Sequence, residues 1–242
     1  RDPQTGWSRD FTVRANNITT VEIPENVAYV DGLSEQVVNK GLQIVSDDTV
    51  SVFCTNIAHL SFDASYVLPT QSLADDYLIQ TDDQSSNTSS LPYVKENETS
   101  AFLIIATEDG TTVDITPSVD TYNGRTAGYE FSVNLNKGQV YQVRSTKSDG
   151  RRDLSGSKVT ARDCKRIAVF NGNNLTAIPR NGGSYDHIFE QAMPLQAWGK
   201  SFVVTSSLER EADYVKITSA ADNNEIRKNG ELIATLELGT SY

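Results

Sequence analysis

Val133-Asn-Leu-Asn-Lys-Gly-Gln-Val-Tyr141 is the stretch that decides the fold, because the chain contains this pattern three times. The other copies are Val21-Glu-Ile-Pro-Glu-Asn-Val-Ala-Tyr29 and Ala234-Thr-Leu-Glu-Leu-Gly-Thr-Ser-Tyr242. Each copy alternates apolar and polar residues and ends in tyrosine, as expected for a half-buried strand. Self-similarity at a fixed period is the signature of repeated supersecondary units.

Other segments recur in the same order and give the length of the unit. Val50-Ser-Val-Phe53 matches Ile167-Ala-Val-Phe170, and Tyr77-Leu-Ile-Gln-Thr81 matches Phe202-Val-Val-Thr-Ser206. Further matched pairs are Ile44 with Val159, Asp63 with Asp186, Pro69 with Pro194, Asp109 with Asp222, and Val113 with Ile226. One unit therefore has roughly 110 residues, the size of an ordinary domain. We expect residues 1–58 to close a first unit, residues 59–180 to form a complete unit and residues 181–242 to open a third.

Short alternating runs separated by turn residues predict an all-β fold. The expected strands are residues 20–23, 42–45, 50–53, 102–107, 113–116, 131–135, 140–143 and 167–170. Residues 35–40 and 187–193 are expected to form a helical turn or two. Asp109-Gly110 and Asn229-Gly230 each predict a hairpin, since Asp-Gly and Asn-Gly supply the positive φ of tight primed turns.

The train of strands favours tandem β-sandwich-like repeats of about 110 residues. A β-propeller is the alternative, but its blades are usually about half this length. The two end regions each lack half a unit. They could pair with each other and close the molecule, or each could pack on the central unit, which is what we expect.

Composition excludes several classes of function. The 242 residues carry a net charge of −11 and no lysine or arginine cluster beyond adjacent pairs, so a nucleic-acid partner is not expected. The longest apolar run, residues 101–106, is far too short to span a membrane. The chain starts at Arg1 and ends in mid-pattern at Tyr242, which leads us to expect a fragment of a longer protein.

The chain has two cysteines, Cys54 and Cys164, with no C-x-x-C spacing. Cys54 follows one Val-Ser-Val-Phe strand and Cys164 precedes its matched strand. A disulfide is therefore possible if those strands are antiparallel neighbours; otherwise the two residues are unpaired small apolar side chains.

Several motifs together resemble the N-terminal domain of the IgGFc-binding protein family. They are Gly41-Leu-Gln-Ile-Val-Ser46, Leu103-Ile-Ile-Ala-Thr-Glu-Asp-Gly110, Gly138-Gln-Val-Tyr-Gln-Val143, Asp153-Leu-Ser-Gly156 and Asp186-His-Ile-Phe-Glu-Gln191 followed by Trp198-Gly-Lys200. The family occurs in secreted, mucus-associated animal proteins and in Bacteroidetes-type bacterial surface proteins, and the Ser/Asn/Asp-rich style resembles the bacterial branch. The resemblance implies an extracellular or cell-surface all-β binding module, with a glycoprotein or glycan as its partner.

Asp186, His187 and Glu190 form the one cluster of chemical groups. On a helical turn, His187 and Glu190 would share a face, and a metal or acid–base pair would be conceivable. However, Ala64 occupies the histidine position in the matched segment. We therefore expect no catalytic residues, metal or cofactor, and a structural role for Asp186. Trp198 replaces Leu73 at its matched position, which is typical of a core residue; a sugar-stacking role is the alternative.

Three functions remain open from the sequence. The first is a non-enzymatic adhesion module that binds mucin, glycan or an immunoglobulin-type glycoprotein, with Asp186, His187, Glu190 and Trp198 as candidate binding residues. The second is a structural spacer that projects another domain from the cell surface. The third is a carbohydrate-active enzyme whose carboxylates are Glu190 and Asp186.

Overall fold

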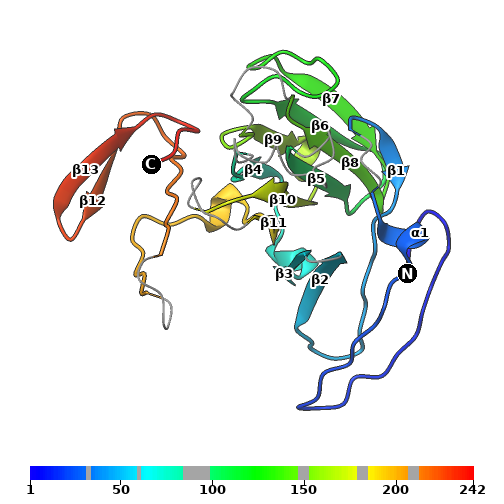
Figure 1. Ribbon diagram of the computed structural model, residues 1–242. Helices are drawn as coiled ribbons and strands as arrows, with labels where there is room; N and C mark the ends of the chain where they lie inside the picture. Colours follow the sequence, from blue (N-terminus) through cyan, green and yellow to red (C-terminus); the bar gives the residue numbers. More distant parts are fainter. Residues whose placement is uncertain (31–33, 59–60, 84–98, 147–152, 179–184, 207–212) are drawn as a thin grey trace.

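The computed structural model describes residues 1–30, 34–58, 61–83, 99–146, 153–178, 185–206 and 213–242 (Figure 1). These residues form four antiparallel sheets and one α-helix of four residues, α1 (Glu25–Ala28). The all-β prediction is confirmed. The propeller alternative is wrong, because none of the four sheets closes and none has the arrangement of a blade. No helix among the described residues has the length and apolar character needed to cross a membrane.

The central body contains two of the sheets. One sheet has five strands in the spatial order β1 (Val37–Asn39), β8 (Gln139–Arg144), β5 (Ser100–Ala106), β10 (Ile167–Thr176) and β11 (Asp186–Gln191). The other has four strands in the order β4 (Asp76–Leu78), β9 (Lys158–Ala161), β6 (Thr111–Thr116) and β7 (Phe131–Leu135).

Both sheets contribute to one apolar core. Phe102, Ile104 and Val169 come from the five-stranded sheet, and Val113 and Val159 come from the four-stranded sheet. All five side chains are fully buried. Every second residue of these strands points inward, as the two-residue period of a strand requires, so the central body is a two-layer β structure stabilised by apolar burial.

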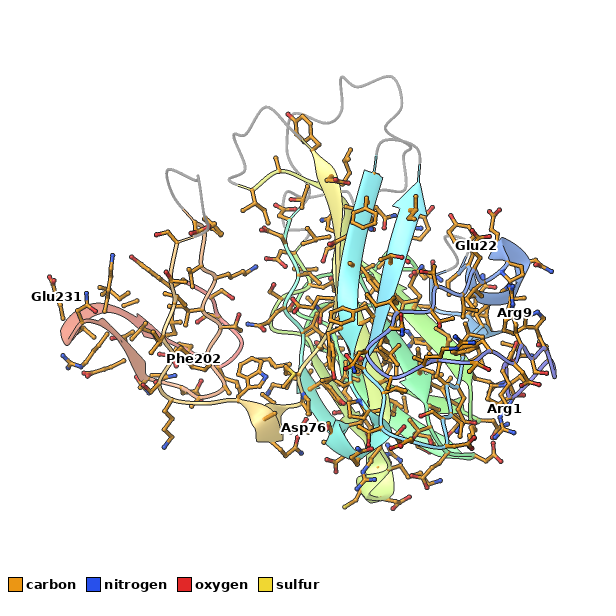
Figure 2. All side chains as sticks on the ribbon, turned by 90° about the horizontal axis from the view of Figure 1, so that it is seen from below. Arg1, Arg9, Glu22, Asp76, Phe202 and Glu231 are labelled. Carbon is orange, nitrogen blue, oxygen red and sulfur yellow. The ribbon has the colours of Figure 1, made fainter. Side chains whose placement is uncertain are left out.

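Two hairpins lie outside this body. The first pairs β2 (Val52–Ala58) with β3 (Ser61–Val67), and the second pairs β12 (Asn224–Lys228) with β13 (Glu231–Leu236). The first residues of the chain and the β12–β13 hairpin lie on opposite sides of the central body (Figures 1 and 2). In Figure 2, Glu231 marks the end of the hairpin, and Phe202 lies on the segment that connects it to the body.

Most of the predicted strands are confirmed, but four local predictions are wrong. Residues 20–23 and 42–45 have no strand structure. The two expected helical turns are strands: β1 pairs with β8, and β11 pairs with β10. In both cases pairing with a neighbouring strand overrides a weak local helical pattern.

The two predicted hairpin turns have different outcomes. Asn229 and Gly230 both have positive φ and join β12 to β13, which confirms that hairpin. Gly110 also has positive φ, but β5 and β6 belong to different sheets. Asp109-Gly110 therefore carries the chain from one layer to the other and does not make a hairpin.

The glycine turn before β8 has a counterpart near Tyr242. Gly138 donates its amide hydrogen to the carbonyl oxygen of Ala106 over 2.9 Å, and Gly239 donates to Ser219 over 2.8 Å. Their φ angles are +80° and +79°, a conformation that glycine adopts without strain. The two turns thus have the same local backbone arrangement.

The matched aspartates stabilise these two turns in the same way. Asp109 Oδ1 accepts from the amide of Lys137, and Asp222 Oδ1 accepts from the amide of Leu238, each over 3.0 Å. The strand pairing beside the turns is also equivalent, with Ile105 opposite Val140 and Thr218 opposite Ser241.

A close glycine–glycine approach also occurs twice. Gly41 donates its amide hydrogen to Gly138 over 2.9 Å, and a Cβ added at Gly41 would lie 2.6 Å from the Gly138 oxygen. A Cβ added at Gly156 would lie 2.3 Å from the Gly239 oxygen. Gly41 and Gly156 precede Ile44 and Val159 by three residues each, so the two contacts join matched positions.

The matched segments 50–53 and 167–170 have different surroundings. Ile167 and Val169 are buried between β5 and the four-stranded sheet, whereas Val50 and Phe53 are exposed. Among the described residues, 52–53 pair only with β3. Tandem repetition of complete units therefore stays a prediction.

Candidate functional site

The candidate residues Asp186 and His187 lie where β11 passes β3. Ser61 Oγ donates to Asp186 Oδ1 over 2.6 Å and lies 2.7 Å from His187 Nδ1. Burial alone would raise the pKa of Asp186, but the hydrogen bonds from Ser61 and from the His187 amide lower it below its usual value. Asp186 is therefore ionised at neutral pH and accepts the single hydroxyl proton of Ser61.

This serine, histidine and aspartate set is not a nucleophilic triad. In a triad, one histidine nitrogen accepts the serine proton and the other donates to the carboxylate. Here the proton of Ser61 goes to Asp186, so Nδ1 of His187 must donate to Ser61. Both partners lie on the Nδ1 side, with Nδ1 3.5 Å from Asp186 Oδ1, and Nε2 is buried without a hydrogen-bond partner. In this arrangement His187 does not accept the proton of Ser61, so the histidine cannot act as its general base.

Further side chains of β3 extend this contact along β11. Asp63 Oδ2 accepts from the amide of Phe189 over 2.7 Å, and Ser65 Oγ accepts from the amide of Gln191 over 2.8 Å. Gln191 Oε1 accepts in return from the amide of Leu68 over 2.7 Å. The two strands therefore run in parallel, held by side-chain to main-chain bonds. We call this set of bonds the β3–β11 contact; its polar groups join the two strands.

Glu190 does not join Asp186 and His187. In a strand, residues three apart point to opposite faces, so His187 and Glu190 do not share a face. Desolvation and then the charge of Asp63 raise the pKa of Glu190. Asp186 and Glu190 are four residues apart in an extended strand, about 13 Å along the backbone. Glycosidase carboxyl groups are about 5 to 9.5 Å apart, so this spacing disfavours the enzyme hypothesis.

Trp198 lies away from that contact, directly after the short 3-10 helix η4 (Leu195–Ala197). Its indole nitrogen donates to the Met193 carbonyl over 3.1 Å, and the side chain is half-buried. Its counterpart Leu73 follows η1 (Thr70–Ser72) with the same extended backbone and is buried. The two positions are structurally equivalent, but Trp198 has less cover.

Cys54 and Cys164 are free thiols in the structure. β2, which carries Cys54, pairs with β3, whereas β10, which follows Cys164, pairs with β5 and β11. The strands are not antiparallel neighbours, so the condition for the disulfide is not met. Cys54 Sγ lies 3.6 Å from the Ser65 carbonyl oxygen, and burial raises the pKa of this thiol. In the described part of the chain, no three His, Cys, Asp or Glu side chains are close enough to hold a metal ion.

One face of the β2–β3 hairpin exposes apolar side chains that the motif analysis did not single out. Phe53 lies opposite Tyr66, and Ile57 lies opposite Phe62. Their exposed fractions are 68%, 45%, 77% and 57% in that order, and the Phe53 and Tyr66 rings meet edge to face at 5.2 Å. The opposite face holds the polar residues of the β3–β11 contact. We call this set of four residues the apolar hairpin face.

The signal for this face was present in the sequence. On the first strand, positions 53 and 57 are apolar but position 55 is threonine. On the returning strand, positions 62, 64 and 66 are all apolar. Alternation predicts which residues share a face. It does not predict that the polar face, and not the apolar one, packs on the body, because that depends on the free amides of β11.

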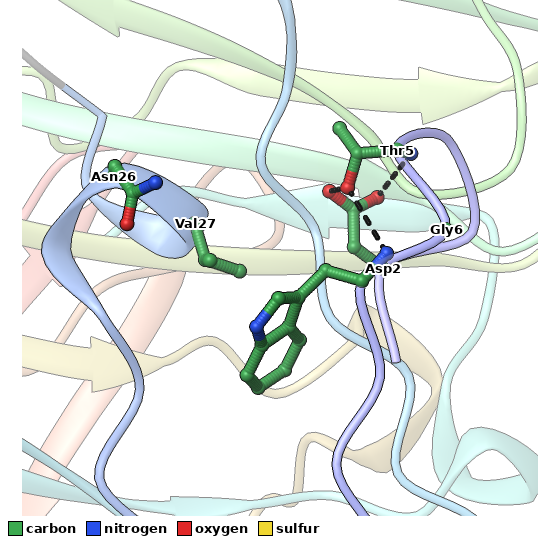
Figure 3. A pocket seen from close by; sticks show the side chains of 6 residues that line it. Asp2, Thr5, Gly6, Asn26 and Val27 are labelled. Carbon is green, nitrogen blue, oxygen red and sulfur yellow. Dashed lines mark hydrogen bonds between the residues drawn. The ribbon is translucent and has the colours of Figure 1, made fainter.

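A hollow of about 430 Å³ lies near the N-terminus, lined by Trp7, Asn26, Val27 and the loop that contains Asp2, Thr5 and Gly6 (Figure 3). The carboxylate of Asp2 is engaged within its own loop. It accepts from Thr5 Oγ1 over 2.5 Å and from the Gln4 amide over 2.9 Å. The hollow therefore offers no free charged group from Asp2, and both polar and apolar side chains line it.

Comparison with known proteins gives one family and one relative. Residues 63–242 match the family described as IgGFc binding protein. The human IgGFc-binding protein is 29% identical over 200 residues, which cover 81% of this chain and 3% of that protein. The chain thus spans a small part of the relative's length. No solved structure matches the chain.

Proposed function

Since this chain belongs to the IgGFc-binding protein family, whose domain is generally a non-catalytic binding domain, we propose that it is an extracellular or cell-surface adhesion module. The observation that carries this proposal is the β3–β11 contact. The one serine, histidine and aspartate cluster of the described residues is used to join two strands. The same contact turns the apolar hairpin face toward solvent.

We assign the binding surface to that face. Phe53, Ile57, Phe62 and Tyr66 place two cross-strand apolar pairs side by side on a two-stranded support. Exposed apolar and aromatic side chains gathered on one face mark protein or ligand contact sites, and aromatic rings are enriched at such sites. The name of the human relative refers to the Fc region of immunoglobulin G, which makes a glycoprotein the first partner to test; mucins and free glycans are the others.

The test is a binding measurement with the 242-residue chain immobilised. Purified human Fc, mucin and a glycan array are presented in turn. We expect saturable binding to one class, and Phe62→Ser should weaken it by roughly tenfold or more because it removes a central aromatic contact. Tyr129→Ser is the matched control, since Tyr129 is an exposed aromatic residue of the central body. Silence across all three classes, or equal loss in both variants, would contradict the proposal.

A structural spacer is the second candidate, and the two glycine contacts favour it. The Gly41–Gly138 and Gly156–Gly239 approaches join matched positions, as expected if successive units of a tandem β-sandwich-like repeat are related by one operation. The resulting chain would be elongated. X-ray scattering should then give a radius of gyration clearly above the ~18 Å of a compact 242-residue chain; a value near 18 Å would count against a spacer.

We also propose that the chain belongs to the bacterial branch of the family, which consists of surface proteins. This proposal is supported by the Ser/Asn/Asp-rich composition of the chain and is independent of which glycoprotein is bound.

A further inference from the structure

Asn-Gly pairs are chemically labile, and this chain contains four of them. They are residues 123–124, 171–172, 181–182 and 229–230. In such a pair the glycine nitrogen can attack the side-chain carbonyl carbon of the asparagine, because glycine has no side chain that would hinder the approach. Residues 181–182 lie outside the described part of the chain. The other three pairs have the same chemistry but lie in different surroundings.

Hydrogen bonds restrain both reacting groups of the pair at residues 123–124. Asn123 Nδ2 donates to the Ser34 carbonyl oxygen over 2.8 Å, and the Gly124 amide donates to the Thr121 carbonyl oxygen over 3.0 Å. Both residues of the pair are exposed, so exposure alone does not make them reactive. The asparagine side chain must break its bond to Ser34 before it can turn toward the glycine nitrogen.

The sheet restrains the pair at residues 171–172. Asn171 is 8% exposed, and its Nδ2 donates to the Gln80 carbonyl oxygen over 2.6 Å. Gly172 lies on β10 between Ala101 of β5 and Phe189 of β11. Attack of this glycine nitrogen therefore requires that the central body opens.

The pair at residues 229–230 has neither restraint. Both residues are exposed in the turn between β12 and β13, with φ angles of +51° and +90°. The Gly230 carbonyl oxygen accepts from Arg227 Nη1 over 3.2 Å. Among the described residues, however, no hydrogen bond engages the Gly230 nitrogen or the Asn229 side chain. A Cβ added at Gly230 would have no atom within 4 Å, so the two reacting groups can approach each other freely.

We propose that Asn229-Gly230 is a site of spontaneous deamidation and isomerisation. Hydroxide removes the proton of the Gly230 nitrogen, which then forms a bond to Cγ of Asn229. The amide nitrogen of Asn229 takes a proton from water and leaves as ammonia. A second water molecule opens the resulting succinimide ring at either carbonyl carbon and leaves aspartate or isoaspartate at position 229. This inference is independent of the binding proposal.

The two products have different effects on the β12–β13 hairpin. Aspartate leaves the main chain unchanged, and Asp-Gly forms the same primed turn as Asn-Gly. Isoaspartate adds one carbon atom to the main chain of the turn, which displaces the pairing of Lys228 with Glu231. Both products add a negative charge to a chain whose net charge is −11. The hairpin therefore differs between a newly made chain and an aged one.

The first test is peptide mapping of the full chain after incubation at mildly alkaline pH. Mass spectrometry with fragmentation that distinguishes isoaspartate from aspartate follows each Asn-Gly pair. We expect residues 229–230 to react roughly tenfold faster or more than residues 123–124 and 171–172, because the restrained pairs react only from locally opened states. In denaturant the three rates should become similar. Equal rates in the folded chain, or a difference that persists in denaturant, would overturn the proposal.

The second test uses two variants at position 229. Gly-Gly supports the same primed turn but has no side-chain amide, so Asn229→Gly should fold normally and form no succinimide at this turn. Asn229→Asp carries the added charge with an unchanged main chain. Hydrogen exchange at residues 224–236 should therefore increase in aged wild type, where isoaspartate accumulates, but not in freshly prepared Asn229→Asp. Isoaspartate without increased exchange would overturn the effect on the hairpin, and aged wild type without either product at position 229 would overturn the site itself.

Discussion

Tyr77 shows how one polar atom is accommodated in the core. Its side chain is fully buried, its hydroxyl donates to the Ile167 carbonyl over 2.7 Å, and it accepts from the Ala74 amide over 3.2 Å. These bonds tie β4 to the start of β10 across the two layers. Burial raises the pKa of the hydroxyl to about 12.

Tyr77→Phe should lower the free energy of unfolding by about 1–3 kcal/mol at pH 7, because the Ile167 carbonyl loses its buried donor. The folded pKa lies above the unfolded value of about 10. The contribution of the neutral hydroxyl is therefore complete below pH 10 and is lost as pH rises toward 12. Urea unfolding at several pH values measures both effects, with exposed Tyr129→Phe as control. A constant difference between wild type and Tyr77→Phe from pH 9 to 12 would contradict the linkage.

Position 172 requires glycine because the neighbouring strand β11 approaches it closely, and not because of a positive φ. A Cβ at this position would lie 1.9 Å from the Ile188 carbonyl oxygen. Gly172→Ala should therefore separate β10 from β11 and cost about 2–3 kcal/mol, as overpacking against a fixed backbone does. Gly199→Ala is the control, because the nearest atom there is a Phe202 ring carbon at 3.4 Å. Thermal unfolding compares the two variants. Equal decreases in melting temperature would show that the close contact with Ile188 does not account for the loss of stability.

At the scale of elements, Lys216 fixes the C-terminal region to the central body. Its Nζ donates to Asp153 Oδ2 over 2.6 Å, to the Thr81 carbonyl over 2.8 Å and to Ser155 Oγ over 2.9 Å. Burial would raise the pKa of Asp153, but the charge and hydrogen bond of Lys216 outweigh burial and lower it.

Lys216→Met should therefore lower the free energy of local opening of the β12–β13 hairpin region by about 1–3 kcal/mol. The core should stay intact. Limited proteolysis should cleave the hairpin region faster in this variant than in the control Lys200→Met. In the wild type, ionised Asp153 stabilises this attachment above about pH 3.9, the pKa of an aspartate in the unfolded chain. The stabilisation is lost as pH falls below that value. Cleavage with an acid-active protease should accelerate below pH 4 in the wild type but little in Lys216→Met. The same acid response in both proteins would be inconsistent with this ion pair.

At the scale of the whole molecule, sequence periodicity predicted the layers but not the placement of the ends. Strands with strong alternation, such as residues 113–116 and 131–135, formed as expected because both sheets bury their inward faces. Residues 20–23 and 42–45 have the same alternation but no partner strand in the described part of the chain, and they are irregular. The β3–β11 contact could not be predicted, because it depends on unpaired amides of β11 that exist only after β10 and β11 have paired.

The two glycine contacts give a prediction at this scale. Gly156→Ala places a methyl group against the Gly239 carbonyl and should release the C-terminal region. Gly124→Ala is a close control, since both glycines have φ of +85° but nothing lies within 4 Å of a Cβ at Gly124. The difference between the two variants isolates the contact. Hydrogen exchange should increase at residues 217–219 only in Gly156→Ala; equal exchange in both would assign the effect to backbone strain alone.

The β3–β11 contact has a mechanical consequence. A ladder of main-chain bonds resists a shearing force along its whole length, whereas β3 is attached to β11 through a few side chains of Ser61, Asp63, Ser65 and Gln191. If the molecule is stretched between its two ends, as a tether under flow would be, this attachment and Lys216 should yield before the core. Single-molecule pulling should record small extensions at low force and then one large extension at higher force. An adhesion protein built this way would lengthen under load and keep its central body folded.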